Sequence, residues 1–174
     1  KKNWLIDVRK NRMTALKEEH GTDYTNMKKI EFIEIASQGS AGDFGEIIAN
    51  GNRSAGGVAS PTRAVFMGGR YTIGAGPSWS VVTNTMEYAT IATKGNTLLF
   101  GDLVVDASTG YAEPTGVSNN TRGLCAGGIQ HPGTRLNTIQ YITIATTGNS
   151  SDFGDLTTER RGTGGCCASS TRSV

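Results

Sequence analysis

Apolar and polar residues alternate over short stretches of this chain, and the same alternation returns three times. One stretch, residues 139–145, reads Ile-Gln-Tyr-Ile-Thr-Ile-Ala, so that polar residues interrupt β-branched and aromatic ones. This composition predicts a largely buried strand. The Thr-Thr-Gly-Asn that follows at 146–149 has the chemistry of a turn. Matching stretches occupy residues 30–36 and 86–92, each with a glycine at the corresponding turn position.

Further features recur at matching offsets, and together they define a repeat of roughly fifty residues. We predict one strand around each Phe-Gly pair, one over residues 56–59, and one over 64–67 that a double glycine closes. Four short antiparallel strands per unit are typical of a propeller blade. The recurring residues to which we assign a structural role are Phe44, Phe100 and Phe153, Arg63, Arg122 and Arg172, and the pairs Gly68-Gly69 and Gly127-Gly128.

An Arg, an apolar strand that ends in Gly-Gly, a variable loop and two aromatic strands resemble the kelch repeat. One such unit runs from Arg63 to Arg122 and the next from Arg122 to Arg172. The kelch family usually has Trp where this chain has Phe44, Phe100 and Phe153, so the array is divergent. The sequence of residues 137–156 also resembles repeats of virion appendage proteins in tailed phages, especially those of cyanobacteria. The resemblance implies an all-β fold of kelch-like β-propeller blades.

The repeats cover residues 30–174, and the third stops at Val174, just where the other two place Phe66 and Cys125. Fewer than three blades do not close a propeller, which takes about four to eight. An open array would leave strand edges unpaired. We therefore expect either that the chain continues beyond this third, truncated repeat, or that further copies or a partner chain complete a ring.

Residues 1–29 are a segment of a different kind, with 8 Lys or Arg against 4 Asp or Glu in a chain whose net charge is only +2. Residues 11–19 predict a short helix that ends before Gly21, and Trp4, Leu5, Ile6 and Val8 predict a strand or an anchoring patch. Two interpretations stay open: a docking segment that ties the array to a larger assembly, or a strand and linker packed on the first blade.

The conspicuous residues offer little catalytic chemistry. Asp-Phe-Gly at 43–45 and 152–154 copies the metal-binding tripeptide of kinases, but it recurs as part of the repeat and lacks the other kinase motifs; we predict that the Phe packs between blades and that Asp and Gly form a turn. His20 and His131 have no carboxylate pattern around them. Cys125, Cys166 and Cys167 fall on strand positions, where we expect small buried side chains. No cofactor or metal is expected.

The repeated arginines and two aromatic residues of a loop are candidates for binding contacts. Each repeated arginine is expected to bind backbone carbonyls or an Asp of the neighbouring blade, such as Asp43, Asp102 or Asp155, with an anion-binding ring as the alternative. Tyr71 and Trp79 lie in a glycine-containing loop and are candidates for contact with a sugar or a protein partner.

The function that we expect is a non-enzymatic structural or adhesion module of a virion, as part of a phage tail or fibre. Its partners would be other virion proteins, copies of itself, or a host surface glycan or protein. The small net charge gives no reason to expect a nucleic-acid partner, and no apolar run is long enough for membrane insertion. The alternatives are a cellular propeller that binds proteins or carbohydrate, and part of a propeller enzyme whose active residues lie elsewhere.

Overall fold

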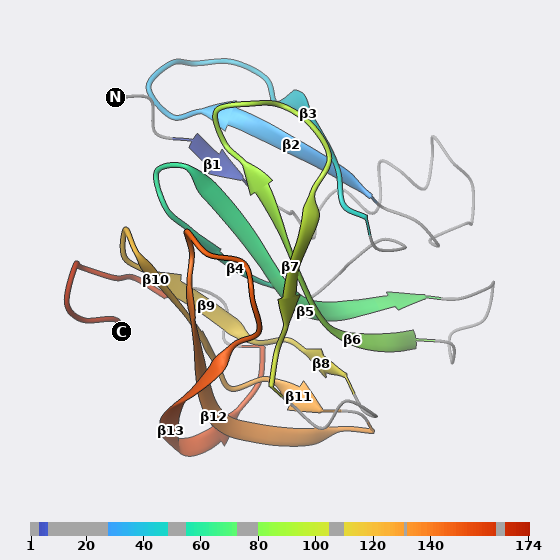
Figure 1. The fold of residues 1–174 in the computed structure, drawn as a ribbon, viewed down its shortest axis with the longest axis vertical. Helices are drawn as coiled ribbons and strands as arrows, with labels where there is room; N and C mark the ends of the chain where they lie inside the picture. The colour runs from blue at the N-terminus through green and yellow to red at the C-terminus, as the bar shows by residue number, and fades with distance from the viewer. Residues whose placement is uncertain are drawn as a thin grey trace.

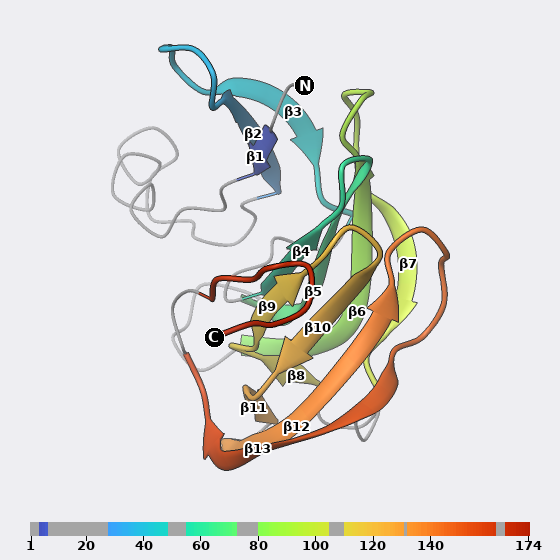
Figure 2. The same cartoon turned by 90° about the vertical axis from the view of Figure 1, so that its left-hand side faces the viewer.

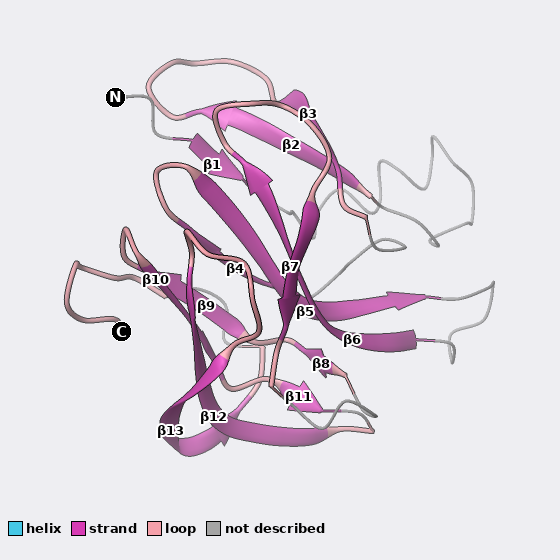
Figure 3. Cartoon of the chain, in the orientation of Figure 1, coloured by secondary structure: helices cyan, strands magenta, loops and turns pink. Residues whose placement is uncertain are grey.

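The structure is a computed structural model, and it describes residues 4–6, 28–48, 55–72, 80–104, 110–130, 132–162 and 166–174. Within these ranges the regular structure consists of strands, and no helix is present (Figure 3). The predicted all-β class is therefore confirmed. The helix expected over residues 11–19 lies outside the described residues, as do His20, Trp79 and His131.

In the described residues, thirteen strands form three antiparallel sheets, which succeed one another along the chain from the top to the bottom of Figure 1. Sheet 1 contains β1 (Trp4–Ile6), β2 (Lys29–Glu34) and β3 (Gly42–Glu46), in that order. Sheet 2 contains β4 (Gly56–Ala59), β5 (Arg63–Thr72), β6 (Ser80–Thr90) and β7 (Leu98–Asp102), each paired with the next.

Sheet 3 repeats this four-strand order with β9 (Thr115–Ser118), β10 (Arg122–Ala126), β12 (Thr134–Thr143) and β13 (Ser151–Arg160). Two short strands extend it beside β12, namely β11 (Ile129–Gln130) and β8 (Tyr111–Ala112). The long strands β12 and β13 curve strongly, so the sheet curls (Figure 2). The prediction of four antiparallel strands per unit is thus confirmed for two units.

The repeat of the sequence is also a repeat of strand register. Arg63 faces Thr90 across β5 and β6, and Arg122 faces Thr143 across β10 and β12. The strand that carries the Phe-Gly pair is bulged against its neighbour in all three sheets. Asp-Phe-Gly therefore lies in a bulged strand and not in the turn that we predicted, because a bulge gives the positive φ of its glycine a place within a sheet.

Strand β1 confirms the expected strand at the N-terminal side, and its register is informative. Leu5 faces Ile33 of β2, whereas Ala64 of β5 faces Ala89, the residue that aligns with Ile33. Strand β1 consequently takes the place in sheet 1 that β5 takes in sheet 2. It supplies the pairing partner that β2 would otherwise lack.

The core lies between the sheets, in two clusters. The larger one joins sheets 2 and 3 through buried residues that include Val65, Met86, Phe100 and Ile144. The smaller one joins sheets 1 and 2 and contains Ile30, Phe44, Phe66 and Ala89. The apolar face of each sheet is therefore buried by its neighbour in the chain, as expected for a stacked repeat.

The prediction that a double glycine closes a strand is confirmed for Gly127-Gly128 and wrong for Gly68-Gly69. Strand β10 ends before Gly127, but β5 continues through Gly68 and Gly69 as far as Thr72, with a bulge. Gly68 and Gly127 share a φ of 60°. A Cβ on Gly68 would lie 2.5 Å from the Tyr111 carbonyl oxygen. The glycine pair thus bends the strand and admits the backbone that leads into the next sheet.

Three positions predicted to be buried are exposed: those of Ile35, Cys166 and Cys167. Ile35 is 57% exposed although Ile91 and Ile144, which align with it, are buried; among the described residues, sheet 1 has no strand in the place that β4 takes in sheet 2. Cys166 and Cys167 are exposed, because among the described residues their segment forms only an isolated bridge between Ala168 and Ser173. Cys125 is buried, as predicted.

Candidate functional site: the junctions between successive sheets

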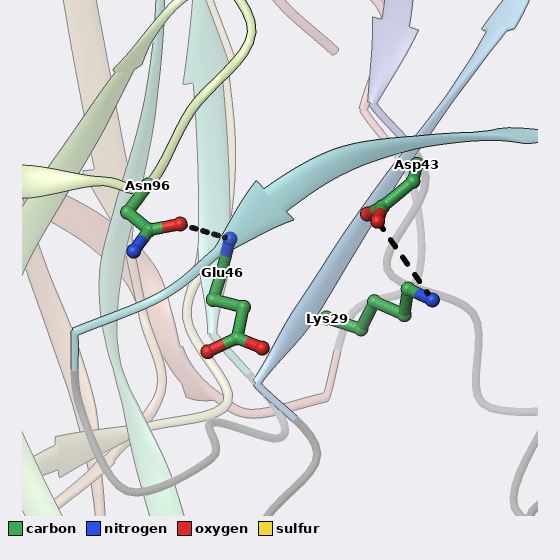
Figure 4. A network of polar contacts seen from close by, with 4 residues as sticks. All are labelled: Lys29, Asp43, Glu46 and Asn96. Atoms are coloured by element: carbon green, nitrogen blue, oxygen red, sulfur yellow. Dashed lines mark hydrogen bonds and ion pairs between the residues drawn. The ribbon is translucent and has the colours of Figure 1, made fainter.

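The most regular arrangement of polar groups lies where the last strand of one sheet meets the last turn of the next, which joins its final two strands. In the first junction, β3 meets the turn between β6 and β7. The Gly95 N–H donates to the Phe44 carbonyl (2.8 Å) and the Thr97 N–H to the Glu46 carbonyl (2.8 Å). The Glu46 N–H in turn donates to Oδ1 of Asn96 at 3.1 Å (Figure 4). The turn therefore satisfies backbone groups at an edge that would otherwise be open.

The second junction repeats these bonds one sheet farther on, between β7 and the turn that joins β12 to β13. The Gly148 N–H donates to the Phe100 carbonyl (2.8 Å), and the Ser150 N–H to the Asp102 carbonyl (3.0 Å). The Asp102 N–H donates to Oδ1 of Asn149 at 3.0 Å. The same atoms are thus used at the same offsets in both junctions.

A buried acceptor ends each junction. Oε2 of Glu87 accepts the Ile48 N–H (2.9 Å) and the Thr97 hydroxyl (2.5 Å). In the second junction Oε1 of Gln140 accepts the Val104 N–H (2.8 Å) and the Ser150 hydroxyl (2.6 Å). An acceptor that takes two donors holds the end of the preceding edge strand, and the low polarity around it strengthens the bonds.

Glycine is required in the edge strand because the turn comes very close. A Cβ on Gly45 would lie 2.1 Å from the Gly95 carbonyl oxygen, and a Cβ on Gly101 would lie 2.2 Å from that of Gly148. Both glycines also have a positive φ, 153° and 155°. Any side chain here would push the two sheets apart.

The recurring phenylalanines and arginines flank the junctions. Phe44 and Phe100 are 5% and 3% exposed and make edge-to-face contacts with Phe32 and Tyr88, at centroid distances of 6.3 and 6.1 Å. Phe153 has the same contact with Tyr141 at 6.0 Å but is 49% exposed. The expected packing between sheets therefore holds for two of the three copies, because no further sheet among the described residues packs on Phe153.

The arginines do not all have one role. Nη1 of Arg63 donates to the carbonyls of Ile144 (3.2 Å) and Ala145 (2.8 Å) in sheet 3, and its guanidinium lies 4.5 Å from the Tyr88 ring centre. Arg122 lies over Tyr141 at 4.9 Å. Arg172 is exposed. Of the two expected partners, a backbone carbonyl of the neighbouring unit is the one that Arg63 contacts.

The acidic residues proposed as arginine partners have other neighbours. Lys29 lies 3.9 Å from Asp43, and both side chains are exposed (Figure 4). Such a pair contributes little to stability. Asp102 contributes its backbone to the second junction, as described above.

The remaining candidate residues are not brought into one site. Tyr71 lies at the end of β5, but its side chain is outside the described structure, as is all of Trp79. Among the described residues, no group of three or more His, Cys, Asp or Glu side chains could hold a metal ion. The same residues contain no helix long and apolar enough to cross a membrane.

Two buried ionisable groups lie next to each other in the core, Tyr111 and Cys125. The Tyr111 hydroxyl donates to the Gly127 carbonyl. Burial raises the pKa of the Cys125 thiol to about 12, and burial also raises the pKa of Tyr111. Both groups stay protonated at neutral pH, so Cys125 is not a reactive thiolate.

Sequence reasoning missed the residues on the turn side of each junction. It aligned the glycines of the three turns but assigned Gly-Asn only to turn chemistry. The signal was that Asn and then Ser or Thr follow the glycine in two copies, although a turn requires only the glycine. The missed residues are Asn96, Thr97 and Glu87 in one junction and Asn149, Ser150 and Gln140 in the other.

Comparison with known proteins gives no family for the chain. No protein-family model matches it. A stretch of 27 residues is 67% identical to part of a putative pyruvate, phosphate dikinase regulatory protein from Pelagibacter ubique (strain HTCC1062). This stretch is 16% of the chain and 10% of that protein. A match of this extent shows neither a family nor an activity for the chain.

Proposed function

We propose that the chain is a non-enzymatic structural or adhesion module of a virion, as part of a phage tail or fibre. In this proposal its sheets are kelch-like blades stacked in series. The module would be joined to other virion proteins and exposed on the particle. The proposal extends the resemblance of residues 137–156 to repeats in phage appendage proteins.

One observation carries the proposal: the recurring polar side chains of each sheet bind the edge strand of the preceding sheet. Asn96 and Asn149 hold the backbone of the preceding edge strand, and Glu87 and Gln140 hold its end. A catalytic constellation would instead aim such groups at an open space where a substrate can sit. Because these side chains instead form hydrogen bonds between sheets, they support a role in building an extended, rigid array.

The test is to locate the chain. Antibodies raised against the purified protein should label tails or fibres of intact particles in negative-stain electron microscopy, and the chain should copurify with particles in a density gradient. Neighbouring genes should encode tail and capsid proteins. A chain found only in the soluble fraction of the host cell, among genes of metabolism, would contradict the proposal. Binding to a glycan array without particle labelling would favour the cellular carbohydrate-binding alternative.

A further inference from the structure

Residues 166–174 contain the same turn that opens sheets 2 and 3. This tight turn precedes each recurring arginine, and in it the side-chain oxygen of the first residue accepts the N–H groups of the arginine and of the threonine before it. This turn is present three times, at Ser60, Asn119 and Ser169. The third turn joins two segments that are paired through Ala168 and Ser173.

These paired segments lie beside sheet 3. The Asn119 side-chain amide donates to the Ser170 carbonyl at 3.2 Å. Between sheets 2 and 3, the residue before Asn119 makes a contact of the same kind: the Ser118 hydroxyl donates to the Ala59 carbonyl at 2.8 Å. The stacking direction of the array therefore continues past sheet 3 and into residues 166–174.

Within the described part of the chain, the junction edge of sheet 3 is open. No described atom lies within 4 Å of a Cβ built on Gly154, whereas the same atom on Gly45 or Gly101 would collide with the next turn. Gly154 nevertheless keeps the positive φ of the other two, at 139°. Phe153 is also half exposed. Strand β13 therefore has the backbone geometry of the edge strands β3 and β7, but no described turn packs against it.

We propose that β13 is the docking edge for one further sheet, which completes the sheet that residues 166–174 begin. Its partner is a pair of strands joined by a turn of sequence Gly-Asn-Ser or Gly-Asn-Thr, with Glu or Gln on the strand before the turn. Continuity with the two existing junctions fixes this chemistry: Gly donates to the Phe153 carbonyl, Asn accepts the Asp155 N–H, and Glu or Gln accepts the Thr157 N–H. The inference rests on the proposed role as a stacked array.

A second copy of this chain is a poorer partner. The corresponding turn of its sheet 1 has Ser40 and Ala41 where the junction turns have Asn and a hydroxyl residue, so it lacks the asparagine amide and the second hydroxyl, and keeps only the acidic residue, as Glu31. In that sheet, moreover, β1 already occupies the place that residues 172–174 would need to take. The β13 edge is therefore expected to bind a further repeat unit in preference to sheet 1 of a second copy.

The experiment extends the full chain by one unit. A copy of residues 125–162 is appended directly after Val174, because Val174 aligns with Leu124. Hydrogen exchange is then followed at the backbone amides of Asp155 and Thr157 in the original β13. A matched control carries the same extension with Asn149→Ala and Ser150→Ala in the appended copy only.

Exchange at both amides should slow about tenfold or more in the extended chain relative to the native chain, since each gains a hydrogen bond that must open first. The control should lose most of this protection, and Gly154→Val in the original β13 should abolish it. Gly154→Val also strains the backbone of β13, so a second variant, Phe153→Lys, is used to block docking at this edge by placing a charge where the next sheet would pack. It should abolish the protection as well. Unchanged exchange in the extended chain overturns the proposal.

Sedimentation of the native chain tests the choice of partner. It should remain monomeric over a wide concentration range. Concentration-dependent association that Gly154→Val removes would show that a second copy occupies β13, which overturns the assignment to a further unit. The hydrogen-exchange and sedimentation results do not depend on where the protein is located. The docking proposal can therefore be refuted while the virion role stands, and the virion role can be refuted while the docking proposal stands.

Discussion

The sharpest prediction compares two glycine substitutions with the same backbone geometry. Gly101→Ala places a methyl group 2.2 Å from the Gly148 carbonyl oxygen, while Gly154→Ala places it in open space. Both glycines have a positive φ, 155° and 139°, so both variants carry backbone strain of about 1–3 kcal/mol. The difference between them isolates the cost of breaking a junction.

That cost can be worked from the bonds of the second junction. Relief of a 2.2 Å contact requires the turn to withdraw by about 1 Å. The bonds from Gly148 to Phe100 (2.8 Å), from Ser150 to Asp102 (3.0 Å) and from Asp102 to Asn149 (3.0 Å) would then be too long to count. At about 1 kcal/mol net for each, Gly101→Ala should be about 3 kcal/mol less stable than Gly154→Ala.

The assay is urea unfolding followed by far-ultraviolet circular dichroism. The native chain and both variants are compared at one protein concentration, and the slope of each transition is checked, because a repeat array can unfold in stages. Gly45→Ala, with its contact of 2.1 Å at the first junction, should behave like Gly101→Ala. Equal destabilisation by Gly101→Ala and Gly154→Ala would refute the account of the junction.

Three further predictions test other parts of the structure. A thiol reagent should label Cys166 and Cys167 in the native protein and Cys125 only after unfolding, as counted by mass spectrometry; rapid labelling of all three would contradict the burial of Cys125. Because burial raises the pKa of Cys125 from 9.0 to about 12, stability should be full below about pH 9 and fall as the pH rises toward 12, by about 2 kcal/mol at about pH 10.5. Urea midpoints measured across this pH range should fall less in Cys125→Ala than in the native chain. Some loss of stability should remain in the variant, because the pKa of Tyr111 is also raised by burial. Arg63→Ala, which loses two bonds to sheet 3, should cost about 2 kcal/mol, against less than about 0.5 kcal/mol for the exposed Arg172→Ala; similar thermal midpoints for the two would contradict the role of Arg63.

Alternation of side chains and recurrence at fixed offsets were enough to predict the strands. The alternating run at 139–145 became part of β12, and its copies became β2 and β6. This works because side chains of a strand point to opposite faces in turn, so a half-buried strand must alternate. The same alignment also predicted the burial of Phe44, Phe100 and Cys125.

Only the tertiary structure decided what lies against each strand. Phe153 begins the same Phe-Gly-Asp-Leu sequence as Phe100, yet it is half exposed, because burial depends on the next sheet and not on the residue's own strand. Strand β1 completes sheet 1 from a segment without repeat character. The asparagines at the turns acquire their partners from a strand about 50 residues earlier. Local sequence determines strand and turn, whereas the bonds that stack one unit on the next are long-range, and their partners become adjacent only when the sheets pack.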